Sequence, residues 1–105
     1  MQLHISINNN NDFLYNILCI KLNNNLIKIP NSIFFIIKNN ANELFGIYRL
    51  CYSVEENNNK NYYLNGTWID SSINNSNIHI EMIQNILNYI TEQNFSSLEI
   101  TEFID

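Results

Sequence analysis

The sequence predicts a small α+β domain, with a mostly antiparallel β-sheet of five or six strands and one amphipathic helix packed on it. Three observations predict this class. A stripe of apolar residues with helical spacing runs through residues 77–94, and period-two alternation recurs in shorter segments before and after it. A chain of 105 residues is also long enough to bury one core and too short for two. We therefore expect a single α+β domain over residues 1–105, in which the helix is followed by a last strand.

Short apolar runs separated by asparagines make up the first part of the chain. Leu3–Ile7 alternates with period two and predicts a strand. Phe13–Leu22 is apolar on both sides, which is typical of a central strand or of an edge strand covered by a second copy. Three asparagines separate it from Leu26–Ile29, so the two runs predict a hairpin. Residues 33–38 are compatible with a strand or a short helix, and their β-branched and aromatic side chains favour the strand.

The second part of the chain predicts a hairpin and then the helix. Leu44–Glu55 and Tyr62–Asp70 alternate as two strands, and Gly66 within the second indicates a bulge or the close approach of another backbone. The helix is expected from Ser76 to Asn94. Its core-facing stripe is predicted to comprise His79, Ile80, Ile83, Ile86, Leu87 and Ile90, and a second apolar shoulder comprises Ile78, Met82 and Tyr89. Leu98–Ile104 alternates as the last strand.

Composition is biased without indicating a function. The chain has 23 Asn and 19 Ile, which we interpret as the codon bias of a genome rich in A and T. Its net charge is −5, and its five Lys and Arg residues are scattered. Direct binding of nucleic acid is therefore not expected, because it depends on clustered cations. The cation-free segment from Tyr62 onward is compatible with a solubilising face or with a negative patch for a basic partner.

Targeting and redox features are weak. The N-terminus has no basic start or apolar run, and no apolar stretch approaches the ~20 residues of a membrane helix. We therefore expect a cytoplasmic protein without a membrane segment. Cys19 and Cys51 lack the spacing of a redox pair and are expected to be reduced and buried.

Residues with catalytic potential are few and poorly spaced. His4 and His79 are the only histidines, and their spacing to the cysteines and carboxylates fits no metal site. Gly46 and Gly66 are the only glycines and both lie inside strands, which excludes a glycine-rich phosphate loop. Glu55 and its neighbour Glu56 point to opposite faces of a strand, so they do not converge. The sequence thus predicts no catalytic, metal or cofactor site.

The aromatic surplus suggests a protein interface instead. Tyr and Trp are enriched at interfaces because they bury a large area yet keep a polar group. Arg49 is the only arginine, and it either covers apolar neighbours with its stem or is presented to a carboxylate, phosphate or protein partner. The candidate partner-binding residues are Arg49, Tyr48, Tyr52, Tyr62, Trp68, Ile78, Met82 and Tyr89.

These observations favour a small acidic, non-enzymatic binding protein. We expect an inhibitor or antagonist, of the immunity or viral and phage counter-defence type, that contacts a basic or nucleic-acid-handling protein. One alternative is a structural subunit that forms an obligate homodimer through Phe13–Leu22. A second alternative is a small enzyme that pairs His79 or His4 with a carboxylate.

Overall fold

Five strands and two helices follow one another in the computed structural model, which describes residues 2–93 and 97–99. Among these residues no helix is both long and apolar enough to cross a membrane. The elements in chain order are β1 (Leu3–Asn9), α1 (Asp12–Leu22), β2 (Ser32–Asn39), β3 (Leu44–Val54), β4 (Lys60–Ile69), α2 (Ser76–Glu92) and β5 (Ser97–Glu99).

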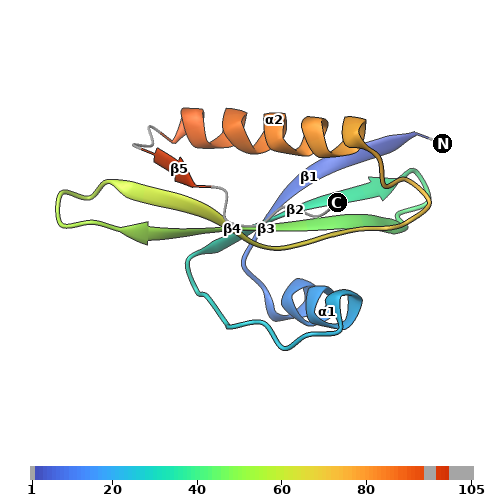
Figure 1. Ribbon diagram of the computed structural model, residues 1–105, viewed down its shortest axis with the longest axis horizontal. Helices are drawn as coiled ribbons and strands as arrows, with labels where there is room; N and C mark the ends of the chain where they lie inside the picture. Colours follow the sequence, from blue (N-terminus) through green and yellow to red (C-terminus); the bar gives the residue numbers. More distant parts are fainter. Residues whose placement is uncertain (1, 94–96, 100–105) are drawn as a thin grey trace.

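The strands form one sheet in the order β1-β2-β3-β4-β5. β1 to β4 are antiparallel neighbours, whereas β5 is parallel to β4 and pairs with it at residues 61–63. The two helices lie on opposite sides of the sheet (Figure 1), so the sheet has an α2 face and an α1 face. Two separate clusters of buried apolar side chains result, one on each face.

Helix α2 is the element that the sequence predicts best. Its N-cap Asn75 accepts a hydrogen bond from the Ile78 N–H at 3.1 Å, which satisfies one of the free donors at a helix start. The buried stripe is rotated relative to the prediction, because Met82 is fully buried whereas Ile80 is 55% exposed. The residues of α2 that pack on the sheet are Met82, Ile86 and Ile90, flanked by Ile78, Ile83 and Tyr89.

The predicted strand over residues 13–22 is wrong, because this segment forms helix α1. The Asn11 side chain accepts a hydrogen bond from the Leu14 N–H at 2.8 Å, and Asn23 ends the helix in the left-handed conformation. Leu14 and Leu18, one turn apart, are buried against the sheet. The segment is apolar on both sides because α1 also carries apolar side chains, such as Ile20, on its exposed side.

The predicted strand over residues 26–29 is also wrong, since this segment is an irregular loop. Two side chains hold it in place. The Tyr15 hydroxyl donates to the Leu26 carbonyl, and the Arg49 guanidinium donates to the Ile27 carbonyl at 2.8 Å. Backbone carbonyls that a strand partner would have satisfied are therefore satisfied by side chains of α1 and β3.

The predicted hairpin is confirmed as β3 and β4, and residues 33–38 are confirmed as part of strand β2. The predicted bulge is also confirmed. Arg49 of β3 lies opposite two residues of β4, Asn65 and Gly66, and Gly66 adopts a φ of 100°. Because a bulge inserts one residue, it moves Thr67 onto the face of the sheet that its neighbour Tyr48 occupies.

The predicted fold class is wrong in two respects. Four strands are antiparallel and two helices are present, instead of five or six mostly antiparallel strands with a single helix. The fifth strand is a three-residue parallel addition, β5, at the start of the predicted last strand. The rest of that predicted strand, residues 100–104, lies outside the described residues.

Candidate functional site

The topology of the sheet points to one end of α2 as a binding site. β4 and β5 are the parallel pair of the described chain, and α2 connects them. In sheets with parallel strands, ligands bind beyond the carboxyl ends of those strands, where the helix N-termini lie. Here that place is the loop of residues 70–75, which joins the end of β4 to the start of α2 (Figure 1).

Hydrogen bonds within this loop fix its shape. The Asp70 carboxylate accepts from the Ser72 N–H at 2.9 Å and from the Ser72 hydroxyl at 2.7 Å, and these bonds lower the pKa of Asp70. The Asp70 N–H donates to the Phe45 carbonyl at 2.8 Å, which ties the loop to β3. Ile73 is buried under the loop and anchors it to the core. The start of α2 is therefore held in a defined position relative to the sheet.

The first turn of α2 is favourable for an anion. It contains no acidic side chain, so no residue of this turn opposes the partial positive charge of the helix N-terminus. Asn75 caps the N–H of Ile78, and the exposed residues Ser76 and Asn77 precede it at the start of the helix. Their backbone N–H groups face the same end of the helix.

A tyrosine and a histidine meet beneath this helix end. Tyr48 on β3 and His79 on α2 are joined by a hydrogen bond between the phenol oxygen and Nδ1, with ring centroids 5.9 Å apart. Burial raises the pKa of Tyr48, so the phenol is neutral at neutral pH and can donate this hydrogen bond. In that arrangement Nδ1 of His79 accepts and the Nε2 atom carries the ring proton, whereas in the opposite tautomer Nδ1–H donates to the phenol oxygen.

Two buried polar atoms of this region have no partner within the described residues. They are Nε2 of His79 and the hydroxyl oxygen of Thr67. Thr67 is the cross-strand neighbour of Tyr48, so both side chains lie on the α2 face. Buried donors without acceptors are rare in native proteins, because each costs about 1–3 kcal/mol. We call Tyr48, Thr67 and His79 the polar cluster.

The polar cluster and the helix end together can bind oxygen atoms. The imidazole Nε2–H and the Thr67 hydroxyl can each donate to a carbonyl or phosphate oxygen of a ligand. The N–H groups at the start of α2 favour a negatively charged group. Within residues 2–93 and 97–99, no three His, Cys, Asp or Glu side chains come together as metal ligands. The arrangement is thus suited to hold a neutral carbonyl or an anion.

Arg49 lies on the α1 face, away from the polar cluster, and it is 1% exposed. Its Nε donates to the Asn65 carbonyl at 2.7 Å, and a terminal nitrogen donates to the Asn65 side-chain oxygen at 3.1 Å. A third bond reaches the loop carbonyl of Ile27 at 2.8 Å, and the guanidinium lies 5.9 Å from the centre of the Tyr15 ring. Arg49 therefore connects the bulge of β4 to the loop after α1.

The other predicted partner-binding residues do not form one surface. Tyr48, Tyr62 and Met82 are buried in the core of the α2 face. Tyr52 is partly buried and lies against Tyr62, with ring centroids 5.6 Å apart. Ile78 and Tyr89 are partly buried on α2, whereas Trp68 lies on the α1 face under Lys21. The structure brings only Tyr48 of these residues into the polar cluster, and their binding to a partner stays a prediction.

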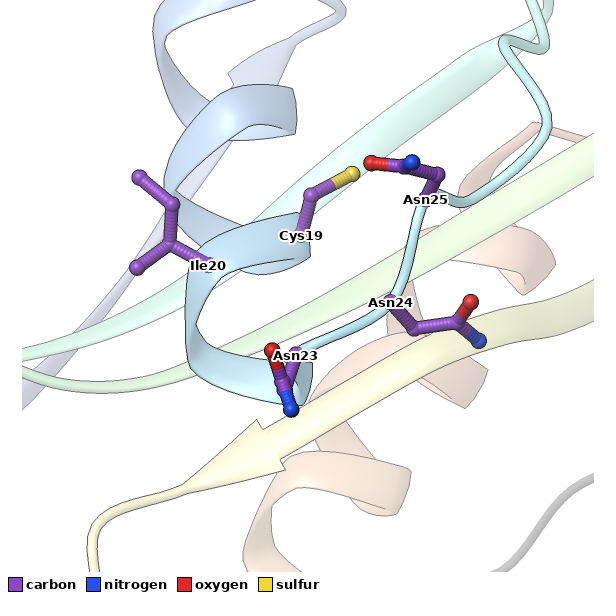
Figure 2. A pocket seen from close by; sticks show the side chains of 5 residues that line it. All are labelled: Cys19, Ile20, Asn23, Asn24 and Asn25. Carbon is purple, nitrogen blue, oxygen red and sulfur yellow. The ribbon is translucent and has the colours of Figure 1, made fainter.

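A hollow of about 280 Å³ lies between the end of α1 and the loop after it. Figure 2 shows its lining of Cys19, Ile20 and three asparagines, with the Cys19 thiol directed toward Asn25. These side chains supply amides and one thiol but no carboxylate, imidazole or cation. The hollow therefore has no acid–base pair, and we do not assign a function to it.

Sequence reasoning missed Thr67 and the loop of residues 70–75. Without the bulge in place, simple alternation puts Thr67 on the opposite face from Tyr62, so its proximity to Tyr48 is hidden. His79 is expected in the core-facing stripe of the helix, but only as one of two histidines whose spacing fits no site. The signal that could have found the pair is a tyrosine and a histidine that both occupy core-facing positions.

Comparisons with known proteins give the fold a context. Neither a family model nor a curated protein matches the sequence. Solved structures that are similar include an aminoglycoside acetyltransferase from an uncultured soil metagenomic sample, with TM-score 0.74, 16% identity, and coverage of 96% of this chain and 78% of that one. A GNAT family acetyltransferase from Staphylococcus aureus has TM-score 0.70 and 12% identity, with 99% and 89% of the two chains covered. A protein from Clostridium acetobutylicum described as a predicted acetyltransferase, solved with acetyl-CoA, has TM-score 0.69 and 10% identity, with 96% and 81% covered.

These similarities show a GNAT-like fold, and they overturn the functional prediction. The expected non-enzymatic inhibitor of viral or phage type is wrong, because the similar structures are those of acetyltransferases, a class of enzymes. The error has a physical cause. Acidity, small size and surplus aromatic residues describe the composition of the chain, whereas the topology that positions a site is not visible in composition.

Proposed function

We propose that this chain binds an acyl thioester of coenzyme A at the start of α2 and transfers its acyl group to an amine. The observation that carries the proposal is the pair of buried, unpartnered polar atoms, Nε2 of His79 on α2 and the hydroxyl of Thr67, whose cross-strand neighbour Tyr48 bonds His79. The GNAT-like fold supports it, since one of the similar acetyltransferases was solved with acetyl-CoA.

The residues of the site fit such a donor in two ways. The phosphates would lie at the N-terminus of α2, whose first turn lacks acidic side chains. The carbonyl oxygens would accept from His79 and Thr67, which supplies the acceptors that these buried donors lack. A bound acyl thioester supplies an activated carbonyl. As the amine nitrogen bonds to the carbonyl carbon, the carbon–sulfur bond would break, and coenzyme A would leave as a thiol with the proton that the amine gives up.

The chain's own residues would orient this carbonyl and polarise it. Where Tyr48 donates to Nδ1 of His79, Nε2 carries the ring proton and can donate to an oxygen on which negative charge develops. Burial keeps this donor out of water, where a hydrogen bond to a developing charge is strongest. His79 and Thr67 are thus binding and polarising groups in the proposal, and Tyr48 is a positioning residue.

The cytoplasm is the location that we propose for this activity. Both cysteines are free thiols, which is typical of a reducing compartment. The amine acceptor is left open within this proposal, and the protein partner or second copy expected from the sequence stays a prediction.

Replacing Thr67 by Val tests the proposal, because valine has the same shape and lacks the hydroxyl. If the hydroxyl serves a ligand, its removal makes the free protein more stable by about 1 kcal/mol, since one buried unpartnered donor is lost. The same change weakens acetyl-CoA binding about tenfold, the equivalent of one hydrogen bond of about 1.4 kcal/mol. Stability is measured by urea unfolding, binding by calorimetry, and transfer by mass spectrometry of a panel of amines.

Thr91→Val is the matched control, because Thr91 is exposed on α2 and bonds only the Leu87 carbonyl, at 2.8 Å. It is expected to leave binding unchanged. The proposal is overturned if the wild-type chain neither binds acetyl-CoA nor acetylates any amine, or if Thr67→Val binds acetyl-CoA as tightly as wild type.

A further inference from the structure

A second hollow, of about 210 Å³, is lined by residues at the start of α1 and in the loop before β2. Helix α1 lies on the side of the sheet opposite α2 (Figure 1), so this hollow is separate from the proposed acyl-transfer site. It is formed where the start of α1 meets the loop that leads to β2. Its volume is that of about seven water molecules, similar to a small free amino acid. The lining residues are Asn10, Asp12, Tyr15, Lys28, Ile29 and Pro30.

The walls of this hollow are fixed by buried groups rather than by surface contacts alone. The Tyr15 hydroxyl holds the Leu26 carbonyl, and the buried Arg49 holds the Ile27 carbonyl directly before Lys28. On the far side, the Ser32 hydroxyl donates to the Ile29 carbonyl at 2.8 Å. The loop that carries Lys28 is therefore tied to α1 through Tyr15, to β3 through Arg49 and to β2 through Ser32.

Two opposite charges line the hollow without neutralising each other. Asp12 and Lys28 form no ion pair with one another or with any other residue of the described chain. The Lys28 ammonium lies 5.5 Å from the centre of the Tyr15 ring, which places the cation beside an aromatic face. A carboxylate and an ammonium that line one small space without pairing suit a ligand that carries one positive and one negative charge.

We propose that this hollow binds a free α-amino acid with an apolar side chain. The ligand's α-carboxylate pairs with Lys28, and its α-ammonium pairs with Asp12. Its side chain lies against Ile29 and Pro30, and the Asn10 amide can bond either charged end. This site is independent of the proposed acyl transfer, because it uses other residues on the other face of the sheet.

Titration of the ¹⁵N-labelled full chain with L-leucine tests the inference. Two relatives of this probe each lack one charge: N-acetyl-L-leucine has no ammonium, and L-leucinamide has no carboxylate. We expect L-leucine to shift the amide signals of Asp12, Tyr15 and Lys28 along a saturable curve. Each single-charge relative should bind about fivefold more weakly, the upper range for one exposed ion pair.

Asp12→Asn and Lys28→Gln remove the two charges separately, and both positions are exposed, so the variants should fold. Each is expected to weaken L-leucine binding about fivefold, while the control Lys38→Gln on β2 leaves it unchanged. The inference is overturned if L-leucine gives no saturable shifts at these residues, if either relative binds as well as L-leucine, or if neither variant weakens binding. Because the readout involves no coenzyme A, its result is separate from that of the proposed acyl transfer.

Discussion

Replacing Gly66 by Ala should destabilise the protein strongly, because the bulge of β4 requires glycine. At Gly66 the backbone has a φ of 100°, where an L-residue is strained by about 1–3 kcal/mol. An added Cβ would also lie 2.9 Å from Leu18 Cδ2 and 3.0 Å from Leu26 Cδ1. Both atoms are ends of side chains that can move aside, so the backbone strain sets most of the cost, and we expect a loss of about 2 kcal/mol.

Gly46→Ala is the matched control in the neighbouring strand. Its backbone has no positive φ, and the nearest atom to the added Cβ is the end of a side chain, Ile37 Cδ1, at 2.8 Å. Since alanine is otherwise favoured over glycine within a strand, the net loss should be about 1 kcal/mol or less. Urea unfolding of both variants decides the matter. The reasoning fails if Gly66→Ala costs less than about 1 kcal/mol, or no more than Gly46→Ala.

Three further predictions concern the core and the buried groups. Met82→Glu buries a charge, so circular dichroism should show an unfolded chain. The free energy of unfolding of Leu87→Glu, on the exposed side of α2, should stay within about 0.5 kcal/mol of that of the wild type. If both variants behaved alike, the orientation of α2 would be wrong. Burial raises the pKa of Cys51 to about 11. At pH 8 a thiol reagent should therefore modify only the partly exposed Cys19 in the native chain, and Cys51 should react only as the pH approaches 11. Two thiols that react equally fast at pH 8 would disprove the burial of Cys51. Arg49→Lys should lower the free energy of unfolding by about 2–3 kcal/mol, because one ammonium cannot reach both carbonyls that the guanidinium bonds. The loop after α1 should then be cleaved faster by a protease. Unchanged proteolysis would show that Arg49 does not hold the loop.

Ionisation of Cys51 should make the protein less stable at alkaline pH. The folded state prefers the neutral thiol, since its pKa rises from 9.0 to about 11 on burial. A raised pKa in the folded state contributes stability below the unfolded value, and this contribution is lost as the pH rises from 9.0 to about 11. The effect of burial is partly offset by the nearby Arg49 charge, which lowers the pKa.

The sequence predicts those elements whose pattern belongs to a single secondary structure. The β3–β4 hairpin alternates over long runs, and the bulge follows from a glycine inside a strand. Helix α2 follows from its 3.6-residue period, although its buried stripe is rotated toward Met82. These features depend on neighbours in sequence, so local patterns suffice to find them.

Helix α1 could not be predicted from its pattern, because two structures explain the same residues. Its apolar residues occupy all sides, as they would in a central strand. Asn23 favours a left-handed conformation, which serves a hairpin turn and a helix end equally well. The deciding contact is the Asn11 cap, which lies in an asparagine run that looks like any other loop.

The candidate site depends on contacts between distant segments. Tyr48 and His79 lie 31 positions apart, and only the packing of α2 on β3 brings them together. Thr67 joins them because the bulge shifts its face. The sequence has no glycine at the start of α2 and therefore no glycine-rich phosphate-binding motif there. The site can be located only from the topology of the sheet.

Mapping acetyl-CoA binding on the ¹⁵N-labelled chain tests the central proposal most directly. The proposal predicts saturable shifts at Thr67, at His79 and at the start of α2, Ser76 and Asn77, with little change on the α1 face. Saturation without shifts at these four residues, or no saturable shifts at all, would contradict it.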